Sequence, residues 1–333
     1  MTGRRLRSIA LWALAAVLML SLLWWGRDDL GRIRSLRPLP LALCFVFTLA
    51  IALTAVLKWR ICLKSMGECC ADRLGSLFYY FMVGRVLGLV IPMEIGDFSV
   101  RTMSLKLDHR VPIGRASYSV YLDRTFDVIV SAILLVPSGL FILGVLGSTA
   151  AFAIGGAAFL GGFLCFAFFG RQTIRGLAVG FGYIFRAICC IPGLRGRVDA
   201  TAETRALAMS GSADVASTLY LLSGVKFIWT ALRFASIALA TGLSVGVGNV
   251  LLFAPGAQAA LVFSVTPGGL GVVDWSWSGL LYRIGVDKHD IVPYLVTMRV
   301  AVLVSVLLIA GCSRFFYRGP VLNAGATGAA EKE

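Results

Sequence analysis

The sequence predicts an all-α, polytopic integral membrane bundle with about six full spans and two interrupted or re-entrant segments. Three observations predict this class. Hydrophobic residues make up 58% of the 333 residues and charged residues only 14%, against about 25% charged residues in soluble proteins. The mean hydropathy is +0.86. Apolar runs long enough to cross a bilayer recur along the chain. A soluble enzyme, a disordered chain and a disulfide-stapled secreted module are therefore excluded.

The net charge of +14 is typical of a membrane protein with basic cytoplasmic loops that face anionic lipid head groups. No nucleic-acid-binding motif accompanies it, so we expect no nucleic-acid partner. The eight cysteines form no C-x-x-C motif, and the chain has two histidines, His109 and His289. These spacings predict neither a metal site nor a bound cofactor.

The first two predicted spans occupy residues 9–25 and 39–57. The first follows a cluster of arginines and is too long for the apolar part of a typical signal peptide. The second is followed by a basic segment, which the positive-inside rule assigns to the cytoplasm: Lys58, Arg60, Lys64 and Arg73.

The third apolar segment, residues 77–93, is interrupted by Gly84, Arg85, Gly88 and Pro92. Its 17 residues are marginal for a straight span. Basic residues lie on both sides of it, which favours entry and exit on the same face of the membrane. We therefore expect a re-entrant or broken helix here.

The remaining spans are predicted at residues 125–146, 149–169, 218–241 and 291–311. An arginine-bearing helix that starts at Arg171 is expected to lie in the membrane interface. A second interrupted segment covers residues 243–265, with a break near Pro255, before the Gly-rich stretch 266–271. Both termini are predicted to be cytoplasmic. The predicted domains are a membrane domain, 1–312, and a short tail, 313–333.

The two interrupted segments share a motif. Pro92 to Gly96 and Pro267 to Gly271 both read P-x-x-x-G, and an acidic residue follows each of them. Interrupted segments at matching places in two halves are typical of transporter repeats around a midplane site. An inverted repeat is one interpretation, and chance recurrence in a Gly-rich chain is the other.

Several ionisable side chains lie within or beside apolar stretches, where a charge costs about 2.5–3.5 kcal/mol on insertion scales. They are Arg85, Asp123, Arg124, Asp127, Lys226, Arg233, Asp274 and Arg299. The cations outnumber the acids by two in this set, and a lipid phosphate is a natural partner for the excess. The alternative is that Arg124 extends to the head groups and Asp123 complements a helix dipole.

Three passages together resemble one known family. They are Gly84 to Leu105, which contains I-P-M-E-I-G-D; Tyr121 to Asp127, which reads Y-L-D-R-T-F-D; and Thr266 to Val286, which begins T-P-G-G-L-G-V-V-D. They are similar to the transmembrane region of lysylphosphatidylglycerol synthases, the flippase-like membrane proteins, over roughly residues 10 to 312. The sequence departs from the family pattern at three positions. Glu94 replaces a basic residue, and Asp123 and Asp274 each replace a glutamate.

This resemblance implies a bacterial inner-membrane protein that moves an anionic phospholipid or a polyprenyl-phosphate-linked lipid between leaflets, and that is not an enzyme. No catalytic residue is predicted. The expected head-group-binding residues are Arg85, Arg101, Arg124, Lys226, Arg233 and Arg299. The expected ion-pairing or proton-accepting residues are Glu94, Asp97, Asp123, Asp127 and Asp274. The expected backbone breaks are at Pro92, Gly96, Pro267, Gly268, Gly269 and Gly271.

Two other functions remain open at this point. One is a membrane glycosyltransferase or lipid-modifying transferase that uses Asp28 and Asp29, or Asp97. The other is a non-catalytic subunit of a lipid or glycan pathway. Membrane lipids are the expected partners, and a homo-oligomer or a complex with a pathway enzyme is a further alternative.

Overall fold

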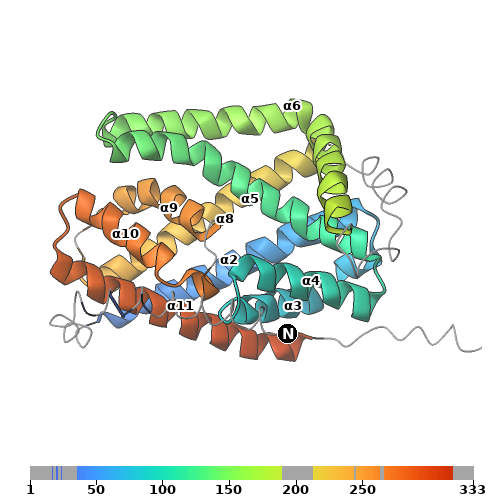
Figure 1. The fold of residues 1–333 in the computed structure, drawn as a ribbon, viewed down its shortest axis with the longest axis horizontal. Helices are drawn as coiled ribbons and strands as arrows, with labels where there is room; N and C mark the ends of the chain where they lie inside the picture. The colour runs from blue at the N-terminus through green and yellow to red at the C-terminus, as the bar shows by residue number, and fades with distance from the viewer. Residues whose placement is uncertain are drawn as a thin grey trace, which may run out of the picture.

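The computed structural model describes residues 36–189, 213–243, 245–262 and 266–317, with four isolated positions between 17 and 24. The predicted first span, residues 9–25, and Asp28 and Asp29 lie outside the described residues, apart from those four positions. The described part is helical and contains no strand (Figure 1). The membrane-spanning helical class is therefore confirmed.

The described elements follow one another along the chain as helices. Their bounds are α2 Pro38–Ser65, η2 Cys69–Asp72, α3 Leu74–Leu87, α4 Met93–His109, α5 Ile113–Ile142, α6 Ser148–Cys189, α8 Ala213–Ala240, α9 Val247–Val262, η3 Pro267–Gly269, α10 Val272–Arg283 and α11 Lys288–Phe316.

Five described helices are long and apolar enough to span a membrane: α2, α5, α6, α8 and α11. They correspond to five of the six predicted spans. Helix α2 packs along α8, and α5 packs against α6, α8 and α9. One apolar core lies among α2, α5, α6 and α8. Two more lie at the two sides of the bundle, one around α3 and the other around α9 and α10.

The predicted interrupted segment, residues 77–93, forms α3 and a turn over residues 88–92, and α4 then packs back along α3 as an antiparallel hairpin. Tyr80 in the middle of α3 donates a hydrogen bond to Asp108 in the last turn of α4 (2.6 Å). The chain thus returns to its starting side through α4, which lies beyond the predicted segment, and the predicted segment itself ends at the hairpin tip. Gly96 is not a break, contrary to expectation. It lies in the first turn of α4, where an added Cβ would be 2.9 Å from the backbone nitrogen of Gly88.

The second interrupted segment is a helical pair, α9 and α10, joined by residues 263–271. The predicted break near Pro255 is wrong, because α9 continues through it to Val262. Proline in a membrane helix is tolerated where neighbouring groups satisfy the freed backbone. The proline leaves the carbonyl of Leu251 without its helical donor, and the hydroxyl of Ser138 on α5 donates to the neighbouring carbonyl of Leu252. Helix α10, over residues 272–283, was not predicted from the sequence.

The predicted interfacial helix is continuous with the preceding span, and both belong to α6. Figure 1 shows that the second part of α6 turns sharply away from the first. In this second part Ile174 and Phe181 are buried, whereas Arg171 and Arg175 are exposed. The helix is therefore amphipathic, with its apolar side against α5.

Candidate functional site

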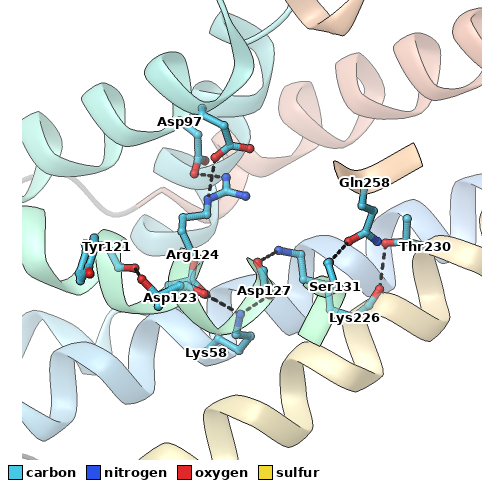
Figure 2. Close-up of polar contacts among 12 residues, drawn as sticks. Lys58, Asp97, Tyr121, Asp123, Arg124, Asp127, Ser131, Lys226, Thr230 and Gln258 are labelled. Atoms are coloured by element: carbon cyan, nitrogen blue, oxygen red, sulfur yellow. Dashed lines mark hydrogen bonds and ion pairs between the residues drawn. The ribbon is translucent and has the colours of Figure 1, made fainter. Parts of the chain in front are cut away.

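The centre of the bundle contains an ion-pair network that begins with two carboxylates one turn apart on α5. Lys58 on α2 lies between them, with its Nζ 3.0 Å from Asp123 Oδ1 and 2.5 Å from Asp127 Oδ1 (Figure 2). The Lys58 side chain is fully buried. A charge in that position requires partners, because burying an ammonium group alone is very costly.

The network extends from Asp123 to helix α4. Arg101 Nη1 lies 2.8 Å from Asp123 Oδ2 and 3.2 Å from Asp97 Oδ2. Arg124 forms an ion pair with Asp97, and its Nε lies 3.5 Å from Glu94 Oε2. The side chains of Asp97 and Arg101 are inaccessible to solvent. This network therefore fixes the first hairpin against α5.

The network also extends from Asp127 to helix α8, where Lys226 forms an ion pair with it. One turn further along α5, Ser131 donates a hydrogen bond to Gln258 on α9 (2.7 Å) (Figure 2). In this network the cations and the carboxylates are equal in number. The cations are Lys58, Arg101, Arg124 and Lys226, and the carboxylates are Glu94, Asp97, Asp123 and Asp127.

A cavity of about 250 Å³ adjoins this network and is lined by α2, α3, α4, α5, α8, α9, α10 and α11. Much of its wall is apolar, including Phe81, Val128 and Leu261. Its charged lining residues are Arg85, Glu94, Arg124, Asp127, Lys226 and Arg233. The cations therefore exceed the carboxylates by two in the cavity wall.

Arg85 and Arg233 account for this excess. No carboxylate lies within 4.0 Å of either guanidinium group in the part of the chain that the structure describes. Arg85 Nη1 contacts the sulfur of Met93 (2.9 Å), and its Cζ lies 5.1 Å from the ring centroid of Phe81. Arg233 has the same distance to the ring of Phe234, and its buried Nε has no hydrogen-bond partner among the described residues.

A second, separate ion pair stabilises the Gly-rich break. Arg299 on α11 binds Asp274 on α10 in a bidentate manner, with Nε–Oδ1 2.7 Å and Nη2–Oδ2 2.8 Å. The same guanidinium donates to the carbonyls of Gly268 and Gly269, both at 3.0 Å. Three glycines adopt positive φ here, at 268, 269 and 271, which other residues adopt at a steric cost.

The two breaks are built alike and meet. Each is followed by a fully buried aspartate, Asp97 or Asp274, that pairs with an arginine on the next helix, Arg124 on α5 or Arg299 on α11. An added Cβ on Gly268 would lie 3.6 Å from the carbonyl oxygen of Leu89. In Figure 1 the two hairpins approach the centre from opposite sides. The two breaks therefore share an aspartate–arginine pair and lie next to each other.

The structure sorts the sequence-predicted residues into three places. Six of them line the cavity, and these are the charged lining residues given above. Asp97, Arg101 and Asp123 lie behind them in the network and do not line the cavity. Asp274 and Arg299 lie at the second break, where the N–H groups of Arg299 donate to Asp274 and to the carbonyls of Gly268 and Gly269.

Lys58 is a site residue that the sequence reasoning missed. The predicted span ends at residue 57, which is wrong, because α2 extends to Ser65 and buries the lysine. One signal could have identified it. The apolar pattern continues beyond Lys58, through Trp59, Cys62 and Leu63, and so the helix does not end at the first charge.

A comparison with known protein families matches residues 9–310 to the family described as the lysylphosphatidylglycerol synthase TM region. A search of curated proteins found no match. The family match covers nearly the whole chain, and it includes both hairpins, the ion-pair network and the cavity. The chain therefore belongs to the lysylphosphatidylglycerol synthase transmembrane region family.

Proposed function

We propose that this protein transports an anionic lipid, either a glycerophospholipid or a polyprenyl-phosphate-linked lipid, between the leaflets of a bacterial inner membrane. The observation that carries the proposal is the central cavity, whose wall contains Arg85 and Arg233 without carboxylate partners among the described residues. Arginine binds phosphate oxygens through paired N–H groups. A lipid head group in the cavity would neutralise charges that are costly at membrane depth.

The two broken segments support transport over a purely structural role. Non-helical backbone at membrane depth is tolerated where it is buried in protein or lines a cavity. Paired interrupted helices in two halves are the arrangement by which many transporters present a substrate site alternately to the two sides. In this protein the turn of the first hairpin contributes Leu89 to the cavity wall, and the second hairpin contributes Val273.

A translocation assay in liposomes tests the proposal. The purified full chain is reconstituted with fluorescent phosphatidylglycerol, and a membrane-impermeant quencher reports the outer-leaflet fraction over time. We expect faster equilibration between the leaflets than in protein-free liposomes. Mass spectrometry should recover the lipid chemically unchanged, which separates transport from a transferase reaction.

The matched variants are Arg85→Gln with Arg233→Gln in the cavity, and Arg171→Gln on the exposed side of α6. We expect the double cavity variant to lose most of the acceleration and Arg171→Gln to retain it. No acceleration by the wild-type chain with any of several anionic phospholipids and polyprenyl phosphates would overturn the proposal.

A further inference from the structure

The cavity wall contains two more cationic than acidic side chains. We use this difference to infer the charge of the ligand. Arg124 and Lys226 in the wall are paired with Asp97 and Asp127. Arg85 and Arg233 have no carboxylate within 4.0 Å in the described ranges, and both line the same cavity. Two like charges inside a low-dielectric bundle repel one another. A ligand with one negative charge would leave one of them uncompensated.

A third group in the wall points to a ligand with several acceptor oxygens. Ser223 on α8 lines the cavity and is 2% exposed, and its Oγ has no hydrogen-bond partner among the described residues. A buried hydroxyl without a partner costs about 1–3 kcal/mol. The hydroxyl of Ser223 and the buried Nε of Arg233 are therefore donors on α8 that lack an acceptor among the described residues, whereas Arg85 Nη1 has only the weak acceptor sulfur of Met93.

The volume limits the size of the group that enters. Pockets that enclose whole drug-sized ligands measure about 300–1,000 Å³, and this cavity measures about 250 Å³. A head group fits into it, while the acyl or prenyl chains of a lipid must remain outside. A terminal phosphate is the smallest head group that a phospholipid can carry.

We propose that the cavity selects a phosphate monoester in its doubly negative form, bound by Arg85 and Arg233, with Ser223 a further donor elsewhere in the same wall, over the singly negative phosphodiesters of ordinary phospholipids. A phosphate monoester carries a charge of about −1.5 to −2 near neutral pH and has three strong acceptor oxygens. Both features match the surplus charge and the unpartnered donors. This inference rests on the proposed function, since it names the class of lipid that the same cavity takes.

The test compares the affinities for two lipids that differ in head-group charge, at a fixed pH of about 8, where the monoester is doubly ionised. The full chain in phosphatidylcholine nanodiscs is titrated with dioctanoyl phosphatidate and with dioctanoyl phosphatidylglycerol, and calorimetry gives the two Kd values. We expect phosphatidate to bind at least tenfold more tightly. Equal affinity, or tighter binding of phosphatidylglycerol, overturns the inference.

The variants test whether the two arginines produce the preference. Arg85→Gln and Arg233→Gln each leave one surplus charge, so the ratio of the two Kd values should fall to within about threefold. Arg85→Lys and Arg233→Lys keep the charge and should keep most of the preference, as should Arg171→Gln outside the cavity. An unchanged ratio in both glutamine variants contradicts the assignment.

Two further arms separate the source of the phosphate and the role of the cavity. Glycerol 3-phosphate carries the same phosphate monoester as phosphatidate but has no acyl chains. If glycerol 3-phosphate binds more weakly than phosphatidate, the site is for a lipid. If the two bind equally, the site is for a soluble phosphate. If the protein translocates lipids but does not prefer phosphatidate, the proposed function stands and this inference is wrong. If the protein prefers phosphatidate but translocates no lipid, the phosphate site stands and the proposed transport function is wrong.

Discussion

The ion-pair network depends on single carboxylates that each serve two cations. Asp123 lies between Lys58 and Arg101, and Asp127 between Lys58 and Lys226. The helical spacing of Asp123 and Asp127 could be read from the sequence, because residues four apart share a helix face. Their partnership with Lys58 could not, because the partners are more than 60 residues apart and meet only when α2 packs against α5.

Replacement of Asp123 by Asn should strongly destabilise the protein. The change removes a charge from a buried network in which cations and carboxylates balance, and breaking such a pair costs about 3–5 kcal/mol. The measurement is the midpoint of thermal unfolding in detergent. Asp72→Asn is the matched control, because its ion pair with Arg60 is exposed and such pairs contribute about 0–1 kcal/mol.

A charge-balanced double variant sharpens this prediction. Lys58→Met combined with Asp123→Asn removes one charge of each sign, so the double variant should unfold at a higher temperature than Asp123→Asn alone. A double variant that is as unstable as the sum of the two single variants would show that the two residues act independently.

At the scale of elements, each hairpin depends on close backbone contact. The sequence predicted the interruption at Pro92 and the flexible glycines at 268, 269 and 271, because proline and glycine have local conformational effects. It did not predict α10, whose 12 residues are too few for a span. It also misplaced a break at Pro255, because a neighbouring helix can satisfy a backbone group that a proline leaves free.

Gly96→Ala should destabilise the first hairpin. The new Cβ would lie within 3.2 Å of backbone atoms of Leu87 and Gly88, which cannot move aside as a side chain can, and such overpacking costs about 1–3 kcal/mol. Gly139→Ala on α5 is the control, since its Cβ meets nothing within 4 Å. The control should be neutral or stabilising by up to about 1 kcal/mol. Equal unfolding midpoints for the two variants would contradict the close contact.

Arg299→Lys should loosen the second break while the charge opposite Asp274 is retained. A lysine ammonium has three donors on a single nitrogen and cannot replace the four hydrogen bonds that the planar guanidinium makes to Asp274, Gly268 and Gly269. Hydrogen bonds to charged groups contribute about 1.5–3 kcal/mol. Amide hydrogen exchange at Gly269, Leu270 and Gly271 should therefore become roughly tenfold to a hundredfold faster. Arg283→Lys, on the exposed side of α10, should leave these rates unchanged; unchanged rates in Arg299→Lys would argue against the proposed contacts.

For the whole molecule, composition together with the apolar runs was sufficient to predict the membrane class and the number of long spans in the described part. The motif shared by the two breaks left an inverted repeat and a chance recurrence as alternatives. The sequence could not show that the breaks touch, because this contact depends on how the two halves pack. The cavity is likewise a property of the packed bundle, since eight described helices contribute to its wall.

The orientation of the bundle gives a prediction at this scale. Arg115 at the start of α5 pairs with Glu68 beside Cys69 (3.1 Å), so this end of the bundle carries basic residues and should be cytoplasmic. The turn before α6 lies at the other end of α5. A Ser148→Cys variant in intact cells should react with an impermeant maleimide, whereas exposed Cys69 should react only after permeabilisation. The reverse labelling pattern would invert the topology.

The contacts of Arg299 have a mechanical consequence for the bundle. One guanidinium joins α11 to the Gly-rich turn and to α10, and α11 also packs against α3 in the other half of the molecule. We therefore expect a tilt of α11 to move α10 and α3 together, because the same helix is attached to both.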